Sequence, residues 1–78
     1  MGYQNAIEVF EDLAAGRVPS TSGVIAGALS LEFIPGASRD VQDAFLALRS
    51  MSAGFAPDLD ESGRARCAHF AEMLRVAS

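Results

Sequence analysis

The chain has 78 residues, with 10 acidic residues against six basic ones and a formal net charge of −4. All the basic residues are arginines and no basic cluster is present, which argues against direct binding to nucleic acid. A single cysteine, Cys67, excludes an internal disulfide, and no paired Cys and His pattern suggests a metal staple. We therefore expect one domain over residues 1–78 that needs no metal or cofactor.

The first predicted helix runs from Tyr3 to Ala15. Its apolar residues recur at helical spacing and occupy about a third of the helical wheel. Gly16 is a typical helix stop, and the early acidic residues leave no room for the apolar run of a signal peptide, so we expect a cytoplasmic protein. The apolar positions are Tyr3, Ala6, Ile7, Phe10, Leu13 and Ala14, and they lie opposite Gln4, Glu8, Glu11 and Asp12.

The second predicted helix, from Thr21 to Phe33, falls mostly within an uncharged stretch that spans 18–31. Ser20, Thr21 or Ser22 can provide its N-cap. A helix that is apolar all round is usually buried, so we expect this helix at the centre of the fold with the others packed around it. The stretch is shorter than the roughly 20 residues that cross a bilayer, so we expect no membrane span.

One side of this second helix carries only small residues. Such a strip allows a neighbouring backbone to approach closely, and this packing must offset the roughly 1 kcal/mol that each glycine costs relative to alanine in a helix. We expect the strip to pack within the domain, with a homodimer interface as the alternative. Its members are Gly23, Ala26, Gly27 and Ser30.

The third predicted helix follows Pro35 and Gly36, is capped by Ser38 and ends at Gly54. Leu46 lies outside its apolar stripe and is a candidate exposed hydrophobic residue. Phe55 follows the helix in a loop and is expected to cover one end of the bundle. The stripe itself consists of Val41, Ala44, Phe45, Leu48 and Met51.

The last predicted helix runs from Leu59 to about Val76. Asp58 and Glu61 have the spacing of a capping box, with Asp in place of the usual Ser or Thr. The apolar face includes Cys67 and Phe70. Four helices joined by loops of about four to seven residues, without any strand pattern, predict an all-α fold: a small compact bundle with short loops.

The string from Asp58 to Gly63 resembles the start of an EF-hand calcium loop. Asp58, Asp60 and Ser62 occupy ligand positions, and Gly63 stands at the sharp turn. The twelfth position, however, holds His69 where the loop requires a bidentate glutamate. Because imidazole is a poor calcium ligand, we favour a plain helix N-terminus over a metal site.

Cys67 and His69 invite comparison with a thiolate–imidazole pair. Residues two apart on a helix point in directions about 200° apart, so the two side chains cannot act together as nucleophile and base. No other nucleophile, phosphate-binding loop or pair of carboxylates in a pocket is evident in the sequence. We therefore expect no catalytic site and no enzyme.

These exclusions favour a non-catalytic protein that binds or inhibits a larger protein through a helical face. Alanine and glycine raise the apolar content well above the roughly 45–50% of typical soluble domains, which leaves apolar surface for a partner or a second copy. We expect Phe33, Leu46 and Phe55 to anchor the contact. An acidic surface would steer the protein towards a basic or nucleic-acid-binding partner.

Two alternatives remain open. The arginine-only, alanine-rich composition is typical of GC-rich bacterial or phage genes. One alternative hypothesis is therefore a phage or mobile-element inhibitor of a host defence nucleoprotein complex, similar in kind to anti-CRISPR proteins. It can also be read as an accessory subunit of a larger assembly. In the inhibitor reading, carboxylates replace the phosphates of nucleic acid, and the candidates are Glu8, Glu11, Asp12, Asp58, Asp60 and Glu61.

Overall fold

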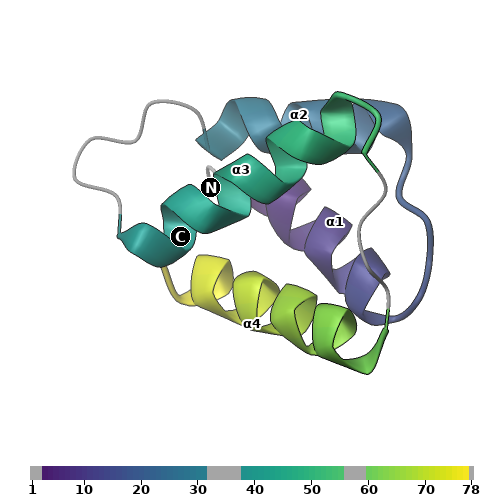
Figure 1. The fold of residues 1–78 in the computed structure, drawn as a ribbon. Coiled ribbons are helices and arrows are strands. Elements are labelled where there is room, and N and C mark those ends of the chain that lie inside the picture. Colours follow the sequence, from purple (N-terminus) through teal and green to yellow (C-terminus); the bar gives the residue numbers. More distant parts are fainter. Residues whose placement is uncertain (1–2, 32–37, 56–59, 78) are drawn as a thin grey trace.

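Four helices and no strand make up the described part of the computed structural model, which comprises residues 3–31, 38–55 and 60–77 (Figure 1). The predicted all-α bundle is therefore confirmed. Within these residues, no helix combines the length and the apolar character needed to cross a membrane. The helices are α1 (Gln4–Ala14), α2 (Thr21–Leu31), α3 (Arg39–Ser52) and α4 (Glu61–Ala77).

The sequence signals for helix ends are largely confirmed. The hydroxyl of Ser20 accepts a hydrogen bond from the Gly23 N–H (3.1 Å), and that of Ser38 accepts one from the Val41 N–H (3.4 Å). Gly16 and Gly54 close α1 and α3 with φ angles of 80° and 100°, a left-handed conformation that glycine adopts without strain.

The start of α4 differs from the expectation. The helix begins at Glu61 rather than Leu59, and its N-cap is Asp60, whose Oδ1 accepts a hydrogen bond from the Gly63 N–H (2.7 Å). The predicted cap, Asp58, lies outside the described residues, as does Leu59. Two aspartates lie before Glu61, and the structure selects the one directly next to it, so the capping box from Asp58 to Glu61 was wrong.

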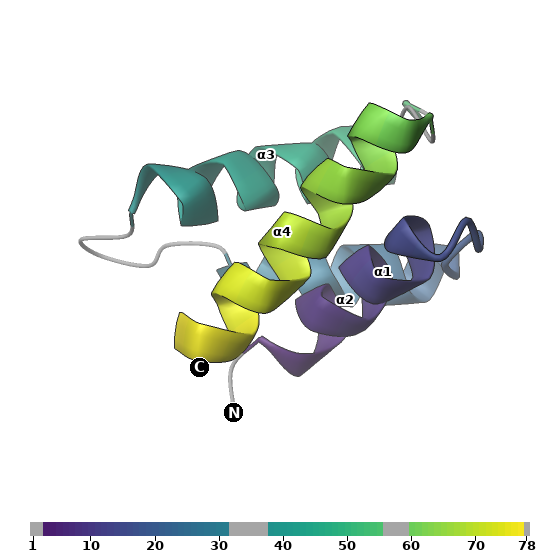
Figure 2. The ribbon, with the colours of Figure 1, turned by 90° about the horizontal axis from the view of Figure 1, so that it is seen from below.

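The centre of the fold is α1, not α2. In Figures 1 and 2, α1 lies between α2 and α4, and it packs against both. Val9 is buried in addition to the predicted apolar face, because α1 is covered on two sides. On the side of α4, the rings of Phe10 and Phe70 pack against each other with 5.1 Å between centroids and an angle of 51° between their planes. The buried residues of α1 are Ala6, Ile7, Val9, Phe10 and Leu13.

The prediction that α2 is buried all round was wrong. Val24, Gly27, Ala28 and Leu31 face the core, but Ile25 and Leu29 keep 44% and 63% of their surface exposed. The burial of α2 was overestimated because no charged residue marks the solvent side of this helix. Hydropathy alone does not distinguish a helix surrounded by its own chain from one with an apolar outer surface.

Gly27 is the point where three helices meet. A Cβ atom at this position would lie 3.1 Å from the Ala6 Cα on α1 and 3.3 Å from the Leu48 Cδ1 on α3. The first contact is to backbone, which cannot move away as the end of a side chain can. The absence of a side chain therefore sets the distance between α1 and α2, and it confirms packing within the domain as the role of this glycine.

Replacement of Gly27 by leucine should destabilise the fold. Overpacking of a closed interior costs typically about 1–3 kcal/mol, which corresponds to a fall in Tm of roughly 5–20 °C for a domain of this size. Ser22→Leu is the matched control, because it adds the same side chain to an exposed position of the same helix. Thermal melting by circular dichroism measures both, and equal Tm values for the two variants would contradict the three-helix contact at Gly27.

Candidate functional site

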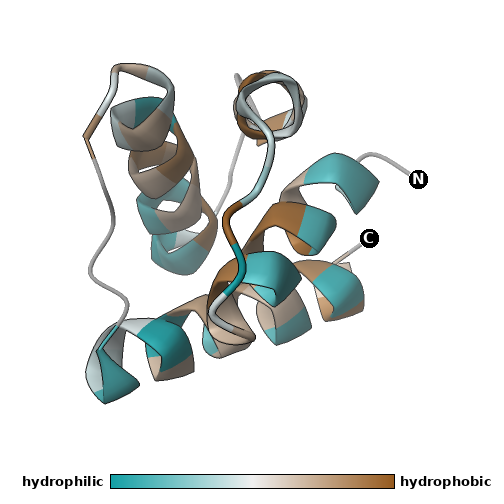
Figure 3. Cartoon of the chain, turned by 90° about the vertical axis from the view of Figure 1, so that its right-hand side faces the viewer, coloured by the Kyte–Doolittle hydropathy of each residue, from teal (hydrophilic) through white to brown (hydrophobic). Residues whose placement is uncertain are grey.

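The outer side of α2 carries apolar surface without a charge. Thr21, Ser22, Ile25 and Leu29 are exposed along it, and we call these four residues the α2 face. Exposed Val18 precedes the helix on the same uncharged stretch. In Figure 3, α2 is seen end-on at the top in white and brown, whereas deep teal alternates with brown on the other helices. Ile25 and Leu29 were not among the predicted binding residues, because α2 was expected to be buried at the centre of the fold.

The predicted apolar anchors do not form one surface with the α2 face. Leu46 is 54% exposed on α3, and Phe55 is 71% exposed just beyond the end of that helix. Phe55 instead lines a pocket between α3 and α4. The third predicted anchor, Phe33, lies outside the described residues.

Two of the three predicted acidic residues of α1 are paired with arginines. Asp12 binds Arg17, with 3.0 Å between Oδ1 and Nη2, and Glu11 binds Arg75 of α4 at 3.0 Å. Glu8 accepts a hydrogen bond from the Gln4 amide. These pairs are solvent-exposed and contribute little stability, about 0–1 kcal/mol each. They do reduce the net negative charge that this side of the molecule presents.

The acidic residues at the start of α4 have a structural role. Asp60 caps the helix, and Glu61 occupies its first turn, where a carboxylate interacts favourably with the helix dipole. Ser62 and Gly63 are already helical, so they do not form the irregular loop that an EF-hand requires. Asp58 lies outside the described residues.

Cys67 and His69 diverge in the structure. Cys67 is buried against the core with 8% of its surface exposed, whereas His69 is exposed on the other side of α4. The His69 Nε2 lies 3.8 Å from the Asp40 Oδ2 of α3. Among the described residues, no group of three or more His, Cys, Asp or Glu side chains could hold a metal ion.

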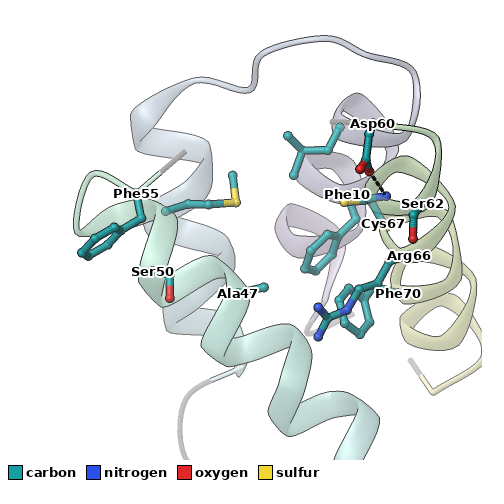
Figure 4. Close-up of a pocket in the computed structure, with 12 residues that line it drawn as sticks. Phe10, Ala47, Ser50, Phe55, Asp60, Ser62, Arg66, Cys67 and Phe70 are labelled. Carbon is teal, nitrogen blue, oxygen red and sulfur yellow. Dashed lines mark hydrogen bonds between the residues drawn. The ribbon is translucent and has the colours of Figure 1, made fainter. Parts of the chain in front are cut away.

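A pocket of about 350 Å³ opens between α3 and α4, with α1 at its base (Figure 4). Arg66 reaches across it from α4, and its guanidinium carbon lies 5.1 Å from the centre of the Phe70 ring. This pocket was not predicted, because its walls come from three helices that are far apart in the sequence. The apolar part of the lining consists of Phe10, Leu13, Ala47, Met51, Phe55, Cys67 and Phe70.

Burial raises the pKa of the Cys67 thiol, and the nearby Arg66 charge partly opposes that rise. A thiol with a raised pKa is mostly protonated at neutral pH and is a weak nucleophile. Cys67 therefore acts as a small apolar side chain in the wall of the pocket.

The small-residue strip of α2 is divided by the fold. Gly27 is buried against Ala6 and is not accessible to a second copy of the chain. Gly23, Ala26 and Ser30 are half-buried, and the Ser30 hydroxyl donates a hydrogen bond to the Gly27 carbonyl (2.7 Å). A dimer interface centred on Gly27 is thus incompatible with the packing of α2 on α1.

Comparisons with known proteins add no family to this geometry. No protein-family model, no curated protein and no solved structure matches the chain. The function must therefore be inferred from the three local features described above: the α2 face, the paired carboxylates and the pocket.

Replacement of Asp60 by alanine should destabilise the protein by about 1 kcal/mol, because it removes the acceptor for the Gly63 N–H. Asp60→Asn retains an oxygen at this position and should lose much less. Urea denaturation measures all variants, with Asp58→Ala as the comparison. A larger loss for Asp58→Ala than for Asp60→Ala would show that the cap has been misplaced.

The stability of the protein should fall at alkaline pH because of Cys67. Since the pKa of this thiol is raised in the folded state, the unfolded chain ionises first as pH increases through the ordinary value of 9.0. The unfolded state then binds fewer protons, and the free energy of unfolding declines. Urea midpoints of wild type and Cys67→Ala are compared at about pH 7 and about pH 9.5. The increase in pH should lower the stability of the wild type more than that of Cys67→Ala. A difference independent of pH would contradict the raised pKa.

Proposed function

We propose that this protein is a non-catalytic interaction protein that binds a larger protein through the α2 face. The observation that supports the proposal is the exposure of Ile25 and Leu29 on a helix without a charged residue. Isolated exposed hydrophobic residues are common on soluble proteins. Here two of them lie four residues apart, on the same side of one helix, and only small hydroxyl side chains accompany them.

The energetics favour a contact that is mainly apolar. Full burial of a leucine or isoleucine side chain gains about 1.5–3 kcal/mol, and only part of this gain appears as affinity because association itself has a cost. Ile25 and Leu29 are partly buried already, so their remaining exposed surface provides a smaller gain. The half-buried small residues beside them allow a partner helix to approach closely.

The acidic groups support this proposal more than they support mimicry of nucleic acid. A mimic requires carboxylates that are free to meet basic residues, but arginines of the same chain already pair with Glu11 and Asp12. We therefore assign the acidic groups the lesser role of steering a basic partner towards the molecule. A subunit held in a larger assembly through the α2 face would satisfy the same geometry.

Charge introduced into the α2 face should abolish binding and leave the fold intact. Leu29→Asp and Ile25→Asp alter exposed positions, and Leu46→Asp is the matched control on α3. The wild type and each variant are used as bait in quantitative capture from an extract of the source cells. Wild type and Leu46→Asp should capture the same protein, and both α2 variants should capture at least about tenfold less of it. Equal capture by all four proteins would contradict the proposal.

The mass in solution, measured by light scattering after size exclusion at two salt concentrations, separates a foreign partner from a second copy. A monomer is expected. If the wild type is instead a dimer, and Leu29→Asp dissociates it while Leu46→Asp does not, the partner of the α2 face is a second copy of the chain and not a larger protein.

A further inference from the structure

We propose that the pocket between α3 and α4 binds a small amphipathic anion, that is, a molecule with an apolar chain or ring and a single carboxylate or sulfonate head. This pocket is separate from the α2 face, since α2 contributes none of its lining. Its volume, its apolar walls and one cation at its edge together define this class of ligand.

The size and lining of the pocket suit a small molecule. Its volume of about 350 Å³ falls within the usual range for ligand sites, roughly 300–1,000 Å³, and such sites combine mainly apolar walls with a few polar groups. Phe10, Phe70 and Met51 provide the large apolar surfaces, while Ser50 and Ser62 are polar lining residues (Figure 4).

The structure explains why this space is open. The helices α3 and α4 contact each other far less than α1 contacts α4 or α2 contacts α3, because α3 packs mainly on α2. Small side chains line both walls, with Ala47 and Ser50 on α3 and Ser62 and Gly63 on α4.

Arg66 selects the charge of the ligand. Its guanidinium stacks on Phe70 and forms no ion pair with any residue in the described ranges, in contrast to Arg17 and Arg75. Asp60 also lines the pocket and keeps its negative charge, but its carboxylate is bound at the start of α4, where its Oδ1 accepts the hydrogen bond of the Gly63 N–H and interacts with the positive end of the helix dipole. A head group next to Arg66 would gain charge-assisted hydrogen bonds at an apolar site.

Other classes of ligand fit less well. A nucleotide or other polyanion requires several cations, and among the residues that the structure describes Arg66 is the only basic one in the lining. A cation would be repelled by Arg66, and the one carboxylate of the described lining, Asp60, is already bound at the start of α4. A neutral hydrophobic molecule would leave the guanidinium without an anion. A monoanion with an apolar tail uses both the walls and the charge.

Decanoate is a suitable probe below its critical micelle concentration. Titration into the ¹⁵N-labelled protein, followed by two-dimensional NMR, should shift the amide signals of Ala47, Gly63 and Arg66 in a saturable way. The amides of Ile25 and Leu29 should remain unchanged. These two residues distinguish the pocket from non-specific binding of an amphiphile to exposed apolar surface.

The charge preference is tested with variants and with a neutral analogue. Arg66→Gln should weaken decanoate binding roughly tenfold, whereas Arg39→Gln, which removes the same charge at the distant N-terminus of α3, should change it little. Decan-1-ol should bind wild type more weakly than decanoate does. If Arg66→Gln fails to fold, the comparison of decanoate with decan-1-ol on wild type still decides the question.

Ala47→Phe fills the pocket from α3 and should abolish the decanoate shifts. Three results would overturn the proposal: no saturable shifts in the pocket, shifts as large at Ile25 and Leu29 as in the pocket, or equal weakening by Arg66→Gln and Arg39→Gln. Saturable pocket shifts that disappear in Ala47→Phe and weaken only in Arg66→Gln would establish the site.

Discussion

The close contact of Gly27 with the backbone of Ala6 is the constraint on which the rest of the fold depends. It brings α2 against α1, and the same position also receives Leu48 of α3. Since α4 packs on the other side of α1 through Phe10 and Phe70, α1 becomes the buried centre of the molecule. A larger residue than glycine at position 27 would separate all three helices at once.

The two candidate functional surfaces follow from this arrangement. Because α2 lies outside α1, its far side has no helix of the chain to cover it, and Ile25 and Leu29 remain exposed. Because α3 is held mainly by α2, it contacts α4 only sparsely, and a pocket remains between them. Both surfaces are thus consequences of how the helices are layered.

The helices themselves were predictable from local signals in the sequence. The apolar spacing of α1 and α3, the serine cap of α3 and the glycines at positions 16 and 54 act within one turn of the chain, so the sequence displays them directly. The cap of α4 was harder, because the aspartates at 58 and 60 both precede Glu61. The sequence pattern allowed either, and the structure selects Asp60.

The layering was not predictable, for a physical reason. Hydrophobicity records which residues avoid water, but not whether the cover comes from the same chain or from another molecule. The uncharged α2 was therefore assigned to the centre, whereas α1, with charges on one side, has that place. The pair of Glu11 with Arg75 and the pocket around Arg66 likewise depend on residues far apart in the chain.

The exposed apolar residues of α2 contribute less to the stability of the isolated chain than buried ones would. Burial is what makes an apolar side chain stabilising, and Leu29 keeps more than half of its surface in water. Glutamate, lysine or glutamine at this position would have similar helix propensity and would increase solubility. A leucine here therefore gains most from a contact outside the chain, whereas Gly27, on the opposite side of the same helix, is required by the fold itself.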